Sequence, residues 1–244
     1  MAGQKQRIVP DGCLEMVFIL GDDIKRHTLD GKTTLQPRAM ILGQITEPFF
    51  VEPTGAVNSF AVRFFPHSFS CFVTTPIKEL TDKETPLAEL LGEQTAHTLE
   101  QAIIQAKSTK ERIDIVEDFL HSQLHNQATI DELVKTTIDT MFTSKGGLSV
   151  KKAVQSDNAK RRQVERYFAR QVGVSPKQLS KVIRLQTALK AMLNDDTKKL
   201  TSVAYESNYY DQAHFIKDFK EFTGITPQEF FESDQMELSS LLYK

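Results

Sequence analysis

An internal repeat limits most strongly what this chain of 244 residues can fold into. The segment Phe168-x4-Gly173-Val174-Ser175-Pro176 returns 51 residues later as Phe219-x4-Gly224-Ile225-Thr226-Pro227. In each copy a glycine suited to a helix C-cap is followed by Ser or Thr and then Pro, the order that ends one helix and begins the next. A solenoid would need further copies. The repeat therefore predicts two similar helical units.

The second copy, Leu200–Phe231, reads as a helix-turn-helix. Thr201 is a candidate N-cap of its first helix, and Asn208 suits a left-handed turn residue. Asp211 can cap the next helix, in which Phe215 and Phe219 recur at helical spacing. That helix is the candidate recognition helix of the unit.

The first copy has the same plan. Ser149–Gln155 is predicted as its scaffold helix and Lys160–Gln171 as its recognition helix. Ser175-Pro176 then begins a long helix that joins the two copies as a spacer. Ser144–Gly147, with two glycines, is predicted as a hinge in front of the first unit.

Charge is divided unevenly along the chain. Residues 1–144 carry 13 Lys and Arg against 20 Asp and Glu, whereas residues 145–231 carry 16 against 9. A basic region behind an acidic one favours contact of the second region with a polyanion.

Residues 1 to about 65 alternate strand signals with turn residues, which favours an antiparallel barrel or sandwich. In Val57–Phe65, the residues Phe60, Val62 and Phe64 form one face of a strand. If these aromatic residues, with Phe18, filled the interior, the barrel would hold no ligand. From about 76 to 143 the pattern is helical, and its apolar stripes could cover the barrel, each other or a second subunit.

The motifs of the second unit resemble those of the AraC/XylS-type bacterial transcription regulators. They are Ala204, Tyr210-Asp211-Gln212, His214-Phe215, Phe219-Lys220, Phe222-Thr223-Gly224 and Thr226-Pro227. The resemblance covers roughly 147–231, and PDGCLEMVFILGD near the N-terminus adds a weaker similarity to a companion domain. It implies an α+β chain with three parts: a cupin-like antiparallel β-barrel domain with a helical segment (1–143), an all-α domain of two helix-turn-helix units joined by a long helix (144–231), and an acidic tail (232–244).

The resemblance implies a sequence-specific regulator that binds two successive major grooves of double-stranded DNA. It places the base-reading positions on the two recognition helices. With the adjacent basic residues, the predicted DNA-binding set is Lys160, Arg161, Arg162, Glu165, Arg166, Gln212, Ala213, His214 and Lys217.

Each of these residues has an ordinary structural alternative. The arginines of the first unit could form a solvated basic face, and Glu165 could orient an arginine instead of accepting from cytosine. His214 could pack locally or contact a phosphate, and Lys217 suits a phosphate better than a base edge. The alternative for the whole chain is an effector-binding or protein-interaction module with weak residual DNA affinity.

The sequence favours no enzyme, cofactor or metal site. Two cysteines cannot build a zinc cluster or a disulfide framework, and neither a phosphate loop nor a Gly-x-Ser-x-Gly elbow is present. His121 and His125 are spaced as a metal pair but lack a further ligand motif. We expect a cytoplasmic protein with no membrane partner. Its expected partners are DNA, an unidentified small-molecule effector, a second copy of the chain, and RNA polymerase if it activates transcription.

Overall fold

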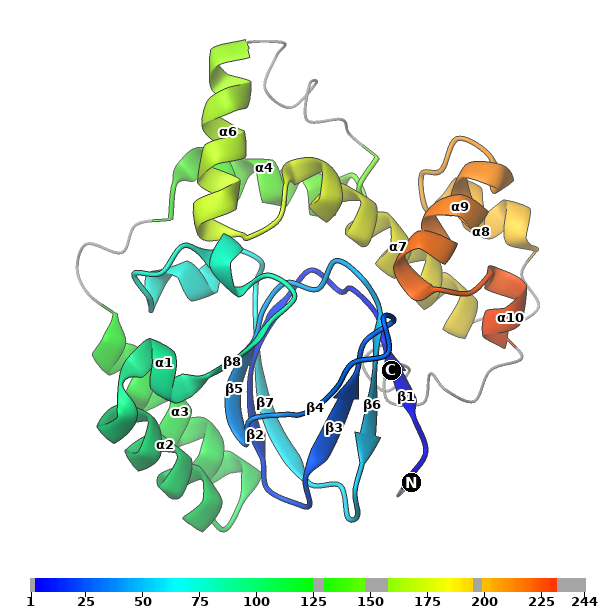
Figure 1. The fold of residues 1–244 in the computed structure, drawn as a ribbon. Coiled ribbons are helices and arrows are strands. Elements are labelled where there is room, and N and C mark those ends of the chain that lie inside the picture. The colour runs from blue at the N-terminus through cyan, green and yellow to red at the C-terminus, as the bar shows by residue number, and fades with distance from the viewer. Residues whose placement is uncertain (1–2, 125–129, 148–157, 195–198, 232–244) are drawn as a thin grey trace.

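Two antiparallel four-stranded sheets form a β-sandwich in the N-terminal part of the computed structural model (Figure 1), which describes residues 3–124, 130–147, 158–194 and 199–231. The first sheet has the order β1-β6-β3-β4 and the second the order β7-β2-β5-β8. The strands are β1 (Gln6–Ile8), β2 (Leu14–Ile19), β3 (Ile24–His27), β4 (Thr33–Leu35), β5 (Ala39–Leu42), β6 (Phe49–Pro53), β7 (Ser59–Phe64) and β8 (Glu84–Pro86). No helix of the described residues is long and apolar enough to span a bilayer.

The second sheet is covered by helices on its outer face. Leu14, Met16 and Phe18 of β2 belong to a buried cluster with the helices that follow the sandwich. These are α1 (Leu87–Leu91), α2 (Glu93–Gln105) and α3 (Thr109–Gln123), with two 3₁₀ turns, η1 (Ser68–Cys71) and η2 (Ile77–Leu80), before them. Because one face of β2 meets helices and the other meets the opposite sheet, its sequence LEMVFI is apolar at nearly every position.

This covering layer answers whether Phe18, Phe60 and Phe64 fill the interior of the sandwich, which the sequence left open. Phe60 and Phe64 share a face with Phe18, and all three pack toward the helices. The interior lies on the other face, where Leu42 and Phe49 meet between the sheets. A two-residue period defines two strand faces, but the element that covers each face decides which is inside.

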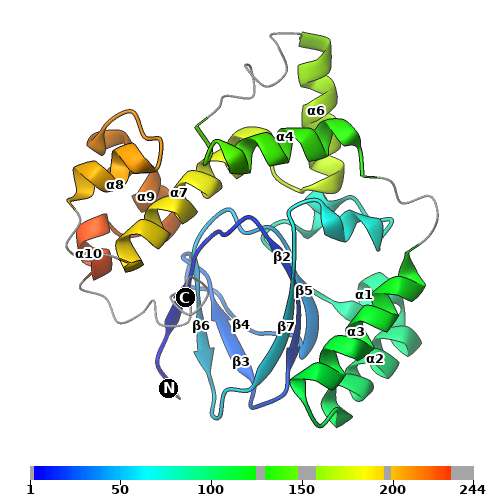
Figure 2. The same cartoon turned by 180° about the vertical axis from the view of Figure 1, so that it is seen from behind.

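The helical part lies across one end of the β-sandwich, as both views show (Figures 1 and 2). It contains α4 (Glu132–Thr143), α6 (Asn158–Gln171), α7 (Pro176–Asn194), α8 (Leu200–Glu206), α9 (Gln212–Thr223) and α10 (Pro227–Phe231). The long α7 joins the two units, as the repeat predicts. The predicted scaffold helix Ser149–Gln155, His125 and the acidic tail lie outside the described residues.

Helix α4 packs with the helical part and not with α1–α3. Val134, Ile138 and Met141 share a buried cluster with Val164 and Phe168 of α6 and with residues of α7. These contacts join α4, which precedes the predicted domain boundary after Thr143, to the first unit.

The α+β class predicted from the sequence is confirmed, with differences in detail. Strands β1 to β7 lie within the first 65 residues, where the strand signals were predicted, whereas β8 lies in the part predicted as helical. Because β8 pairs with β5, the strands extend well past residue 65. The prediction that Thr201 caps α8 is wrong: Lys199 occupies the N-cap, and the Thr201 hydroxyl lies 3.0 Å from Gln212 Oε1.

Candidate nucleic-acid interface

Helix α6 presents one apolar side to the protein and one basic side to solvent. Val164 and Phe168 are fully buried against α4 and α7. Arg161, Arg162, Glu165 and Arg166, which belong to the predicted DNA-binding set, are all exposed. The backbone of Lys160 lies in α6, and its side chain is outside the described part. Arg162 and Arg166 lie one helical turn apart, so both can enter one groove.

Two contacts hold parts of this basic side in place. Arg161 Nε lies 3.1 Å from Glu165 Oε1, which gives Glu165 the arginine partner that its orienting role requires. The Arg166 guanidinium lies 5.2 Å from the ring centroid of Tyr167. Both pairs are at the surface, where they fix side-chain orientation more than they stabilise the fold.

Helix α9 is set up by the local chemistry that the sequence predicts. Asn208 has a φ of 59° in the turn, and Asp211 Oδ1 accepts a hydrogen bond of 2.7 Å from the backbone N–H of His214. Phe215 and Phe219 are fully buried. Gln212, Ala213 and Lys217, three members of the predicted set, are exposed on the outer side of α9.

His214 is less free than its neighbours in α9. It is half-buried, its ring meets that of Tyr209 edge to face at 5.3 Å, and its Nε2 lies 3.5 Å from Asp218 Oδ2. These contacts support the local packing alternative for His214.

A buried ion network that the sequence did not reveal fastens α9 to α7. Asp218 is 2% exposed, with Lys181 Nζ 3.1 Å from Oδ1 and Arg184 Nη2 3.4 Å from Oδ2. A buried carboxylate needs such partners to offset its desolvation. No local pattern marks it, because Asp218 looks like a solvent-facing acid of an amphipathic helix.

Hydrogen bonds hold the predicted hinge, Ser144–Gly147, in place in this structure. Gly146 has a φ of 72°, and its carbonyl accepts hydrogen bonds of 2.9 Å from Ser180 Oγ and from Arg184 Nη1. Asn208 Nδ2 donates to Ser144 O at 3.1 Å, so the turn of the second unit contacts the same segment. Ser144–Gly147 thus joins the end of α4 to α7 and to the second unit.

Two family models match the chain. Residues 157–233 match a helix-turn-helix domain, and residues 2–86 match a domain of unknown function, DUF6597. The first match spans α6 to α10, the helices that carry both predicted recognition faces.

Residues 157–233 therefore form a helix-turn-helix domain of the AraC type. A helix-turn-helix domain of this type binds DNA.

Solved structures with a similar arrangement include ToxT from Vibrio cholerae O395. That structure has 14% sequence identity and a TM-score of 0.49, and the alignment covers 95% of this chain and 94% of that one. Wild-type ToxT from Vibrio cholerae strain SCE256 with a bound unsaturated fatty acid has 12% identity and a TM-score of 0.48, with 94% and 91% covered. No curated protein matches the chain. At identities this low, the fatty acid bound to ToxT says nothing about a ligand of this chain.

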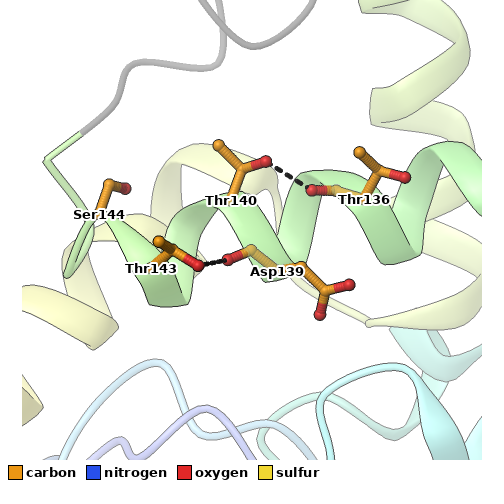
Figure 3. A pocket seen from close by; sticks show the side chains of 5 residues that line it. All are labelled: Thr136, Asp139, Thr140, Thr143 and Ser144. Atoms are coloured by element: carbon orange, nitrogen blue, oxygen red, sulfur yellow. Dashed lines mark hydrogen bonds between the residues drawn. The ribbon is translucent and has the colours of Figure 1, made fainter.

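A pocket of about 340 Å³ lies on the outer side of α4 (Figure 3). It is lined by Thr136, Asp139, Thr140, Thr143 and Ser144. Two of its hydroxyls already donate to the helix backbone, Thr140 to Thr136 O at 2.7 Å and Thr143 to Asp139 O at 2.8 Å. These hydroxyl protons are unavailable to a ligand, so this pocket is a weak candidate for a ligand-binding site. Among the described residues no group of three or more His, Cys, Asp or Glu could hold a metal.

A polar row lies on the inner face of the second sheet at its edge strand β7, where the Arg63 side chain is 35% exposed. Arg63 and Glu15 oppose each other across β7 and β2, on the same face as Leu42, with Arg63 Nε 2.9 Å from Glu15 Oε1. Arg63 also pairs with Asp11. On the first sheet, Gln6 is 1% exposed, and its amide has no hydrogen-bond partner among the described residues.

Glu15 makes the stability of the sandwich depend on pH. Burial raises its pKa from 4.5 to about 7, helped by nearby Asp11 and opposed by Arg63. Between these pH values the folded protein holds a proton that the unfolded chain releases, so the free energy of unfolding falls as pH rises through this window. Between pH 5 and 8, we expect the free energy of unfolding of Glu15→Gln to fall by about 1–3 kcal/mol less than that of the wild type. Urea unfolding between pH 5 and 8 measures it.

The exposed Glu93 on α2 supplies a matched control, because Glu93→Gln makes the same substitution at the protein surface. Asp11, whose pKa burial also raises, remains in Glu15→Gln and keeps part of the slope. An unchanged slope in Glu15→Gln would show that Glu15 is not the group that titrates.

Proposed function

We propose that this chain is a sequence-specific transcription regulator whose helices α6 and α9 enter two successive major grooves of one DNA duplex. The observation that carries the proposal is that two repeat-equivalent helices expose polar faces while one continuous helix joins them. With 19 residues, α7 is about 28 Å long. One turn of DNA separates successive major-groove sites by about 34 Å, so this spacer has the right order of length.

The two recognition helices contribute unequally in this proposal. By the repeat, Arg162 corresponds to Ala213 and Arg166 to Lys217. Arginine can donate two hydrogen bonds to the O6/N7 edge of guanine, which alanine cannot do and lysine does with less fixed geometry. Helix α6 therefore supplies most of the base discrimination, and α9 supplies phosphate contact through Lys217 with finer reading by Gln212. Lys160 and Arg161 add phosphate contacts at the start of α6, and Glu165 orients Arg161.

The N-terminal part acts in this proposal as the sensing or self-association unit of a cytoplasmic regulator. The polar row of Glu15 and Arg63 and the unsatisfied amide of buried Gln6 support a ligand-binding interior over a purely structural one, because an orphaned buried amide costs stability. The effector is a small polar molecule, and RNA polymerase is the further partner if the regulator activates transcription.

Selection from a random-sequence duplex library with the full-length protein tests the proposal. We expect an enriched sequence with two half-sites about one helical turn apart. Its affinity should fall linearly in a plot of log K against log salt, with a slope of about −0.9 per phosphate neutralised. Recovery of no preferred duplex at moderate salt, or a flat salt dependence, would contradict the proposal.

A further inference from the structure

The C-terminal ends of the two recognition helices, α6 and α9, both contact the N-terminal part. The glycines at these two ends are equivalent in the repeat. Gly173 follows α6 and Gly224 follows α9, and both have left-handed backbones, with φ of 92° and 76°. A Cβ on Gly173 would lie 3.0 Å from Thr81 Oγ1, and a Cβ on Gly224 would lie 3.0 Å from Arg7 Nη1. Each glycine thus allows the N-terminal part to approach the end of one recognition helix closely.

A hydrogen bond fixes each of these ends. Thr81 Oγ1 donates to Gly173 O at 2.9 Å, and Arg7 Nη1 donates to Thr223 O at 2.6 Å. Arg7 is 8% exposed, and its guanidinium lies 4.5 Å from the ring centroid of Phe50 on β6. The carbonyls at a helix C-terminus lack partners within the helix, so they are natural acceptors for outside donors.

The loop between β1 and β2 holds the middle of the spacer helix. Gln186 Nε2 of α7 donates to Pro10 O at 2.5 Å. Gly12 lies against α7, since a Cβ there would be 3.2 Å from Leu179 Cδ1. Gln44, itself 1% exposed, donates to Gly12 O at 2.8 Å and so ties this loop to the sandwich.

We propose that the N-terminal part positions the two recognition helices relative to each other, with Thr81 and Arg7 as the positioning residues. Within the helical part, α7 and the contact of Asn208 with Ser144 join the two units, and a long helix can still bend and twist and so change their mutual angle. The sandwich contacts the C-terminal ends of α6 and α9 and the middle of α7, and these three contacts remove that freedom. The exposed faces of α6 and α9 stay clear of these contacts, so the helices are held in a form that can meet DNA.

The consequence is strict recognition of half-site spacing. A protein with a fixed distance and angle between its two recognition helices fits one spacing and loses affinity at others. This inference rests on the proposed function, because it concerns the geometry with which the same two helices meet DNA.

The experiment uses the duplex selected by the wild-type chain, and versions with one to three base pairs added or removed between the half-sites. The measured quantity is the ratio of affinities for the original and altered spacings. For Arg7→Ala combined with Thr81→Val we expect this ratio to shrink by about threefold to tenfold, the effect of removing one or two hydrogen bonds. A loss of folded protein alone would weaken binding to every duplex equally and leave the ratio unchanged.

Matched controls exist within the same sandwich. Arg38 donates to Ile19 O and Gly21 O, and the Thr54 hydroxyl donates to Asp23 O, in each case without touching the helical part. Arg38→Ala and Thr54→Val should keep the wild-type ratio, and Thr81→Ser, which retains the hydroxyl, should keep it too.

If Arg7→Ala combined with Thr81→Val shows the same affinity ratio between original and altered spacings as the wild type, the inference is wrong. The proposed function is not affected by that result. If the double variant does not fold, Thr81→Val alone decides, since it replaces one half-buried hydroxyl by a methyl of the same size. If the wild-type chain selects no duplex, the proposed function fails and this inference fails with it.

Discussion

Replacing Arg162 and Arg166 together with alanine is expected to weaken binding to the selected duplex by roughly 30-fold to 10⁴-fold. Each arginine that contacts a guanine edge contributes about 1–3 kcal/mol, and about 1.4 kcal/mol corresponds to a tenfold change in affinity. Both side chains are exposed and lie on one side of α6, so their removal should leave the fold unchanged. Fluorescence anisotropy with the selected duplex and with duplexes altered in one half-site measures the loss.

The repeat supplies the comparison variant. Lys217→Ala removes the residue of α9 that corresponds to Arg166, and we expect a smaller loss that is nearly the same for every sequence, because lysine contacts phosphate. Lys110→Ala, an exposed cation on α3, should have no effect beyond a small change from net charge. An affinity within about twofold of the wild type for the Arg162/Arg166 double variant would favour the alternative of a protein-interaction module with weak DNA affinity.

Phe219→Ala is expected to destabilise the helical part by about 3–5 kcal/mol. The ring is fully buried and meets Phe215 and Phe230 edge to face, at 5.5 Å and 5.6 Å between centroids. Its removal leaves a cavity where α9, α10 and α7 meet, and it loses aromatic contacts as well as buried area. Since a domain is typically stable by about 5–15 kcal/mol, the second unit should unfold at a markedly lower urea concentration.

An exposed aromatic residue nearby gives the control for this substitution. Tyr210 is 86% exposed, so Tyr210→Ala should change the free energy of unfolding by less than about 0.5 kcal/mol. Phe168→Ala, at the equivalent position of α6, should resemble Phe219→Ala in size. A loss below about 1 kcal/mol for Phe219→Ala would contradict the packing described for the second unit.

Much of the helical part could be predicted from the sequence because its signals are local. Asp211 caps α9 as predicted, and Asn208 and both repeat glycines have the left-handed backbones that their residue types indicate. Ser175 with Gln178 and Thr226 with Glu229 form equivalent capping boxes at the starts of α7 and α10. These features depend on neighbours within a few residues.

The candidate DNA-binding residues were predicted in part by the same local logic. The sequence placed Arg162, Arg166, Gln212 and Lys217 on the outer sides of their helices, and all four are exposed. It did not reveal that His214 shares Asp218 with Lys181 and Arg184, because two of those three partners come from another helix.

The sequence by itself determined two similar helical units with their spacer, the cap of α9, an acidic part followed by a basic one, and a set of short strands. These follow from backbone preference, side-chain period and charge, which act over short stretches of chain. The tertiary structure alone decided that Phe18, Phe60 and Phe64 face helices and that α4 joins the first unit. It also decided that the N-terminal part holds both recognition helices, through pairs such as Arg7 and Thr223, which lie 216 residues apart. A strand or helix pattern predicts that one face will be buried, but only the tertiary structure shows which element covers that face.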